Sequence, residues 1–188
     1  MAISINQIES GIGLLINGEI WIVNEYNHVK PGKGSAFVRV RIRNLKTDNV
    51  LERTFRSAES LDEVIIEERR LQNLYESGDF YHFMDQTSYE EIVVPKSLIG
   101  DQIKFLQDNL EVTGLFYKNE IQRITLPTFI IAEIKETEPG YRGDTTKSGT
   151  KPAQIDTGAA VQVPLFIGVG EFIKVDTRTG DYVERVKK

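Results

Sequence analysis

Among the side chains of this sequence, that of Lys33 has the neighbours best suited to presenting a reactive group, its amine, to a partner molecule. It follows Pro31 and stands between Gly32 and Gly34. Proline and glycine shape turns, and glycine lets a partner's surface approach the backbone closely. A solubilising lysine on a turn is the simpler interpretation of these four residues alone. The basic residues on either side favour a role in binding.

Arginine recurs at every second position just after this turn, at Arg39, Arg41 and Arg43, with aliphatic residues between. In an extended chain this alternation places the guanidinium groups on one face and the aliphatic side chains on the other. Residues 28–56 hold eight basic residues and two acidic ones. The segment therefore predicts a strand face that attracts phosphate, with an ordinary solvated face as the alternative.

Sequence motifs for catalysis are missing. The chain has no cysteine, no nucleophile elbow and no phosphate-binding loop, and its G-x-G pairs lack the third glycine of a dinucleotide fingerprint. The histidines, His28 and His82, have no spaced partners that would predict a metal site or a triad. We expect neither an enzyme nor a metal protein.

The elements that would position these residues are mostly strands. Residues 19–26 and 36–43 are strand-like, and they predict a long hairpin with its tip at residues 31–34. Short apolar runs separated by turn residues continue to the end of the chain, which is typical of small β-barrels. Residues 95–106 permit a short helix, and the polar, turn-rich residues 138–152 predict a long loop.

Composition limits the class of protein further. Of 188 residues, 40% are hydrophobic and 27% charged, and no apolar run approaches the roughly 20 residues that a membrane-spanning helix needs. The N-terminus lacks the pattern of a secretion signal, so we expect a cytoplasmic protein without a membrane partner. The formal net charge is −5, and it is uneven, because residues 64–127 hold six basic residues against eleven acidic ones.

Residues 30–40 resemble the modified-lysine loop of the bacterial elongation factor P family. The C-terminal part resembles the signature of that family at Lys151-Pro152-Ala153, Gly158, Val161, Val163-Pro164, Phe166-Ile167 and Gly170. Residues 143–145 are similar to its messenger-contacting loop and residues 172–183 to its final hairpin. The resemblance extends over essentially the whole chain.

This resemblance implies an all-β fold of three small barrels in series. An SH3-like (KOW-type) barrel would span residues 1–63 and carry the Lys33 loop, and OB-like barrels would span residues 64–127 and 128–188. The change of charge near the first boundary is consistent with this division.

The resemblance also implies a function. The protein would be a non-enzymatic translation elongation factor that binds both ribosomal subunits between the peptidyl and exit sites. It would contact the peptidyl tRNA and relieve stalling at consecutive prolines. It would act as a monomer without a cofactor. Lys33 would reach the CCA end and be the target of a lysine-modifying enzyme.

Individual roles follow from the same resemblance. The loop that frames Lys33 consists of Lys30, Pro31, Gly32, Gly34 and Ser35. The residues expected to contact the transfer RNA backbone are Arg39, Arg41, Arg43 and Lys46. Those expected to contact the exit-site messenger are Arg142, Gly143, Asp144 and Thr145. From its residues alone, this last segment is equally a flexible connector.

Two alternatives remain. A paralogous elongation-factor-P-like protein would have a different tip, and lysine rather than arginine at position 33 counts against it. A general single-strand-binding OB-fold protein would need an aromatic platform on one barrel face. Phe80, Tyr81 and Phe83 are candidates for such a platform, although they lie in the acidic third of the chain.

Overall fold

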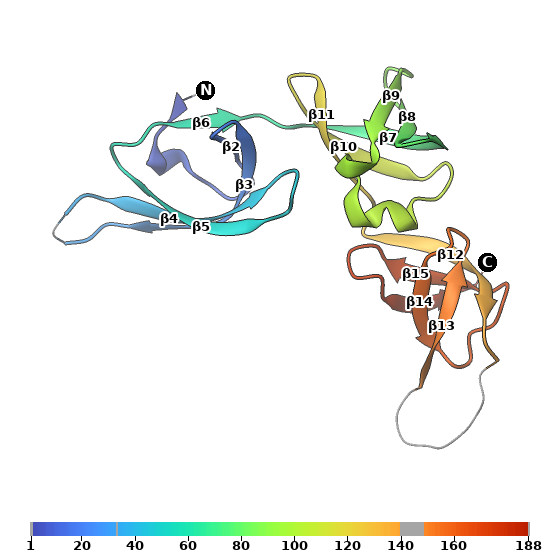
Figure 1. The fold of residues 1–188 in the computed structure, drawn as a ribbon. Coiled ribbons are helices and arrows are strands. Elements are labelled where there is room, and N and C mark those ends of the chain that lie inside the picture. Colours follow the sequence, from blue (N-terminus) through green and yellow to red (C-terminus); the bar gives the residue numbers. More distant parts are fainter. Residues whose placement is uncertain (1, 33, 140–148, 188) are drawn as a thin grey trace. The chain divides into compact units, whose positions relative to one another are not determined.

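Sixteen short strands and three 3-10 helices make up the computed structural model, which describes residues 2–32, 34–139 and 149–187. The predicted all-β class is confirmed, and the strands form curled sheets (Figure 1). In the described part of the chain, no helix combines the length and apolarity needed to cross a membrane. Two compact units can be distinguished, residues 1–68 with 114–123 and residues 69–113 with 124–188.

The N-terminal sheet has the strand order β1-β6-β2-β3-β4-β5. Its strands are β1 (Ala2–Ile3), β2 (Gly13–Ile16), β3 (Glu19–Val29), β4 (Phe37–Asn44), β5 (Val50–Arg56) and β6 (Leu61–Val64), and the helix η1 (Ile5–Gln7) follows β1. Residues from all of these elements build one core. It consists of Ile3, Ile5, Ile8, Leu14, Trp21, Val23, Val38, Val40, Ile42, Phe55 and Leu61.

The second sheet has the order β11-β10-β7-β8-β9, and the third has the order β14-β13-β12-β15-β16. The strands of the second sheet are β7 (Glu67–Ser77), β8 (Phe80–Asp85), β9 (Glu91–Pro95), β10 (Glu111–Tyr117) and β11 (Glu120–Thr125). Those of the third are β12 (Phe129–Thr137), β13 (Thr150–Ile155), β14 (Ala160–Pro164), β15 (Phe172–Asp176) and β16 (Tyr182–Val186). The helical segment expected within residues 95–106 is present as η2 (Lys96–Leu98) and η3 (Gly100–Phe105).

The same six-residue turn occurs once in each sheet, at residues 44–49, 85–90 and 176–181. In each, the first residue is a buried Asn or Asp whose N–H donates to the carbonyl of the sixth residue at 2.8–2.9 Å. Its side-chain oxygen accepts backbone N–H groups two or three residues ahead. The fifth residue has φ between 59° and 79°. The first residues are Asn44, Asp85 and Asp176, and the fourth are Thr47, Ser88 and Thr179.

Candidate functional site

The Lys33 loop connects the ends of β3 and β4, the hairpin that extends to the left in Figure 1. Lys33 itself lies outside the described residues. The other loop residues, Lys30, Pro31, Gly32, Gly34 and Ser35, are all exposed. Gly34 has φ +115°, a backbone conformation that residues with a Cβ rarely adopt. The described part of the loop thus contributes nothing to a core and requires glycine on one side of position 33.

The arginines of β4 lie on the face of the sheet that points away from the core. Val38, Val40 and Ile42 are at most 1% exposed, whereas Arg39 and Arg41 are exposed. The period of two residues per pleat therefore separates the hydrophobic side chains from the guanidinium groups, as the sequence predicts.

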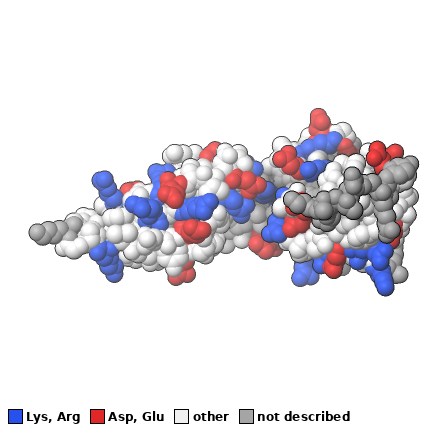
Figure 2. Space-filling view, turned by 90° about the horizontal axis from the view of Figure 1, so that it is seen from below, with Lys and Arg blue, Asp and Glu red and all other residues white. Residues whose placement is uncertain are grey.

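Neighbouring strands give Arg39 and Arg41 different surroundings. Arg39 lies between the neutral residues Asn27 on β3 and Thr54 on β5. Arg41 lies between Glu25 and Glu52, and its Nη1 is 3.8 Å from the Glu25 carboxylate. Basic and acidic side chains are interspersed on the face that Figure 2 shows. Arg39 is therefore more available to a phosphate than Arg41.

Arg43 is engaged within the protein. Its Nη1 donates to Asp48 Oδ1 at 2.7 Å, and Arg123 donates to the other oxygen of the same carboxylate and to the carbonyl of Leu45. Burial raises the pKa of the Asp48 carboxyl, but the hydrogen bonds from the two arginines outweigh it and hold this pKa below its ordinary value. Arg43 thus neutralises a structural carboxylate, which weakens the case for its expected contact with RNA.

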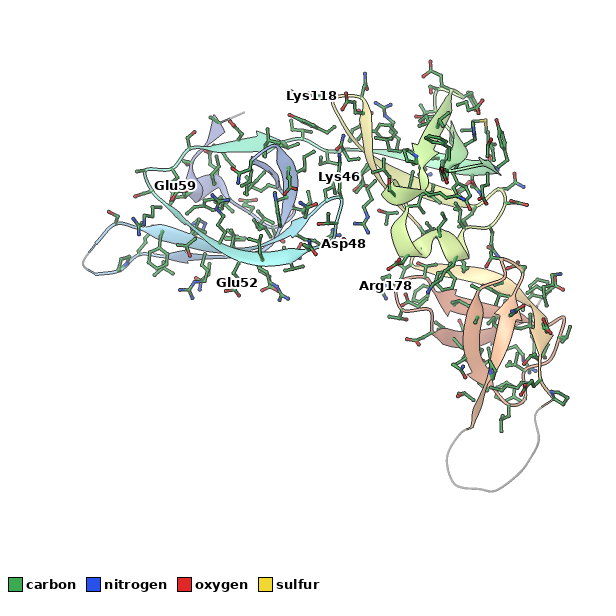
Figure 3. All side chains as sticks on the ribbon, viewed as in Figure 1. Lys46, Asp48, Glu52, Glu59, Lys118 and Arg178 are labelled. Atoms are coloured by element: carbon green, nitrogen blue, oxygen red, sulfur yellow. The ribbon has the colours of Figure 1, made fainter. Side chains whose placement is uncertain are left out.

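Lys46 lies in the turn after β4, at the opposite end of this strand from the Lys33 loop (Figure 3). Its backbone N–H and that of Thr47 each donate to Asn44 Oδ1 at 3.0 Å. The Asn44 amide in turn donates to Glu19 at 3.1 Å. Asn44 is a positioning residue that the sequence analysis missed.

Arg142, Gly143, Asp144 and Thr145 lie outside the described residues. The strands that flank this segment, β12 and β13, are tied together at its base. Lys151 is only 7% exposed and its Nζ donates to the Glu138 carbonyl at 2.7 Å, while Thr137 Oγ1 donates to the Pro152 carbonyl at 3.0 Å.

The aromatic candidates on β8 divide between two faces. Tyr81 and Phe83 belong to the core, at 9% and 0% exposure, so these two candidates for the platform of a single-strand binder do not form one. Burial, together with a hydrogen bond to Glu76, raises the pKa of Tyr81 to about 12. Phe80 is 45% exposed. Alternation along the strand explains the division, because residues 81 and 83 point inward.

An unforeseen group of side chains lies across β7, β8 and β9. The rings of Tyr75 and His82 are stacked with their centroids 4.3 Å apart, and His82 Nδ1 is 2.5 Å from Glu91 Oε1. The hydrogen bonds from His82 and Tyr75 keep the pKa of the Glu91 carboxyl below its ordinary value. The Glu91 carboxylate beside these two rings repels phosphate, which disfavours a general single-strand binder. In the residues described, no three acidic or histidine side chains form a metal site.

Comparisons with known proteins agree with this architecture. Residues 4–61 match the family model described as the elongation factor P KOW-like domain, residues 66–124 the elongation factor P OB domain, and residues 130–185 the elongation factor P C-terminal domain. Elongation factor P of Thermoanaerobacter sp. (strain X514) is 46% identical over 184 residues, covering 98% of this chain and 100% of that protein. Elongation factor P of Microcystis aeruginosa (strain NIES-843) is 50% identical over 183 residues, covering 97% of this chain and 99% of that protein. This chain belongs to the elongation factor P family.

As a member of the elongation factor P family, the chain is a ribosome-associated translation elongation factor. Its fold is similar to that of eukaryotic translation initiation factor 5A from Methanococcus jannaschii. That match has a TM-score of 0.53 at 24% identity, and it covers 66% of this chain and 93% of the other. The KOW-like and OB domains confirm the expected barrel types. The boundaries at residues 63 and 127 and the roles of the site residues stay predictions.

Proposed function

We propose that this elongation factor P family member binds between the peptidyl and exit sites of the ribosome and brings Lys33 to the CCA end of the peptidyl tRNA. There it stimulates peptide-bond formation, above all between consecutive prolines. The observation that carries the proposal is the β3–β4 hairpin. Its loop residues are exposed beside position 33, and its strand β4 turns Arg39 and Arg41 outward.

Positioning is the physical basis of this activity. Guanidinium groups hold the sugar-phosphate backbone without reading its sequence. A cation fixed beside the peptidyl end favours the reactive arrangement of a constrained substrate such as proline. Correct orientation of reactants lowers the barrier of a reaction by at most about 7–11 kcal/mol. The factor contributes geometry, and the ribosome forms the bond.

Covalent extension of Lys33 belongs to the same proposal. An added arm that carries an amine lengthens the reach of the side chain and adds hydrogen-bond donors. A separate lysine-modifying enzyme supplies the group, and the activity needs no other cofactor. Arg142, Gly143, Asp144 and Thr145 contact messenger RNA at the exit site, so that one monomer reaches both ribosomal subunits in the cytoplasm.

The test is synthesis of a proline-run peptide in a purified translation system. Lys33→Ala leaves the folded protein intact and abolishes the stimulation of synthesis. Lys118→Ala removes an equal charge from an exposed turn on another hairpin and leaves the stimulation unchanged. Full activity of Lys33→Ala would refute the proposal.

The modification is tested separately by mass spectrometry of the protein purified from its native cell. A mass increase confined to the peptide that contains Lys33 is the expected result. An unmodified peptide with full activity in translation removes the covalent extension from the proposal.

A further inference from the structure

Strand β3 contains a bulge at Asn24 that changes which face each later residue occupies. Val23 pairs with Ile42, but Glu25 rather than Asn24 pairs with Arg41. A bulge adds one residue to one strand and re-aims the side chains beyond it. Every residue of β3 between the bulge and the Lys33 loop is therefore displaced to the opposite face from the one that a regular ladder would give it.

Hydrogen bonds from the chain before β2 hold the bulge. Ser10 Oγ donates to the Asn24 carbonyl at 2.7 Å, and the Gly11 N–H donates to the Val23 carbonyl at 2.7 Å. Both carbonyls of the irregular step thus have a partner, so the bulge is a fixed feature of the sheet.

The bulge puts two aromatic rings on the face opposite the arginines. Tyr26 pairs with Val40 and His28 with Val38, both on the core side of β4. In a regular ladder Tyr26 would instead pair with Arg39 on the cationic face. Although their partners are at most 1% exposed, Tyr26 is 43% exposed and His28 is exposed as well. The two rings meet edge to face, with centroids 5.3 Å apart and an interplanar angle of 74°.

The hairpin arm consequently has two chemically distinct faces, guanidinium groups on one and aromatic rings on the other. We propose that the Tyr26–His28 pair is a stacking site for an unpaired base at the 3′ end of the transfer RNA, while Arg39 on the opposite face contacts phosphate. This inference rests on the proposed function and adds a base-contacting site to it.

The position of the pair agrees with such an occupant. Tyr26 precedes the end of β3 by three residues, which is about 10 Å at the rise of a strand. A ring at that distance behind the loop can meet the unpaired end before it reaches Lys33. An edge-to-face pair also leaves ring faces uncovered for a base, and every base has a π-face that can stack.

Charge distinguishes this pair from the Tyr75–His82 pair of the second sheet. Tyr75 and His82 hold a carboxylate, Glu91, directly beside their rings. His28 begins a segment, residues 28–56, that holds eight basic residues against two acidic ones, and Tyr26 lies two residues before it. A polyanion is therefore attracted to the Tyr26–His28 pair and repelled from the Tyr75–His82 pair.

A double-mutant cycle tests the inference directly. The peptidyl-site transfer RNA on the ribosome is either intact or lacks the base at one of its unpaired 3′ nucleotides, each nucleotide being tested in turn. The affinity of the full chain is measured for every combination of protein variant and transfer RNA. Tyr26→Ala weakens binding to intact complexes by about 5- to 150-fold, the range for one base stacked on an aromatic side chain. Against the abasic complex that lacks the stacked base, the same substitution has no further effect.

Matched variants complete the design. Tyr26→Phe keeps the ring and the affinity, and His28→Ala weakens binding only while the base is present. Tyr75→Ala removes a ring of similar exposure from β7, 50% against 43%, and changes nothing. Thermal unfolding checks that each variant folds. Equal losses by Tyr26→Ala at intact and abasic transfer RNA, or no loss at either, overturn the stacking site.

These outcomes are distinguishable from failure of the proposed function. If Lys33→Ala retains full activity in proline-run synthesis, the proposed function falls, and the cycle still decides whether a base stacks on Tyr26. If Lys33→Ala is inactive and the cycle shows no coupling, the function stands and the stacking site is wrong.

Discussion

Arg39 and Arg41 share a face of β4, but their neighbours predict unequal contributions to RNA binding. We expect Arg39→Gln to weaken ribosome binding and to reduce the slope of log affinity against log salt by about 0.7–0.9, the effect of losing one phosphate contact. Over a fourfold rise in salt, that change of slope alters the affinity by about threefold.

Arg41→Gln has a smaller effect, because its guanidinium already has an acidic partner. At 3.8 Å the attraction to the Glu25 carboxylate is worth about 1 kcal/mol in water, and side-chain entropy and salt reduce it further at this exposed site. A phosphate must replace this partner, and it also meets the charge of Glu52 across the other side of the strand. Both effects offset part of the gain from contact.

The same geometry predicts that removing the competing carboxylate strengthens binding. Glu25→Gln frees Arg41, so affinity for the ribosome rises and the salt slope steepens by up to about 0.8. Glu184→Gln is the control, since it removes an equal charge from an exposed ion pair, with Lys174 at 3.1 Å, on the last hairpin. Binding isotherms at several KCl concentrations give the slopes. A loss of slope for Arg41→Gln that equals or exceeds that for Arg39→Gln refutes the reasoning, and so does an unchanged affinity for Glu25→Gln.

Two further predictions concern the last turn. Hydrogen bonds from Arg178 lower the pKa of the Asp176 carboxyl from 3.8 to about 2. The contribution of this carboxylate to stability is therefore complete above pH 4 and is lost as the pH falls toward 2. The difference in melting temperature between wild type and Asp176→Asn should shrink over that range. Gly180→Ala should lower the free energy of unfolding, measured in urea, by roughly 1–2 kcal/mol, because φ is +79° and a Cβ would lie 3.3 Å from the Phe105 ring. Gly78 has φ +60° and open space around it, so Gly78→Ala should lower the free energy of unfolding by less.

Local patterns were enough to predict the hairpin and the face of its arginines. Alternation along residues 37–43 is a property of a single strand, so the outward position of Arg39 and Arg41 needs no knowledge of the partner strands. The glycine at position 34 is equally local, since its positive φ is a requirement of the turn.

Contacts that depend on register could not be predicted in this way. Glu25 and Glu52 flank Arg41 only because β3 and β5 pair with β4 in the observed register. His82 and Glu91 likewise approach each other from two paired strands, and their sequence spacing shows no motif. Periodicity assigns a residue to a face, and the turns and the core then decide what lies opposite.

The turns did leave a signal in the sequence. An Asn or Asp followed three residues later by Thr or Ser occurs at Asn44, Asp85 and Asp176, each the last residue of a strand. Side-chain capping of the backbone explains both types, because the Asx oxygen accepts the N–H groups of the turn and the hydroxyl accepts the N–H that follows. A search for this spacing could have found one hairpin in each sheet.

The bulge at Asn24 shows where a prediction from periodicity fails for a physical reason. Residues 19–26 look like one continuous strand, and a continuous strand would set Tyr26 beside Arg39. What interrupts the period is a pair of hydrogen bonds from Ser10 and Gly11, residues of the turn that precedes β2. A shift of one residue exchanges the two faces of a strand. These contacts come from more than ten residues away in sequence, and because they fix the bulge, the arm presents aromatic rings and guanidinium groups on opposite sides.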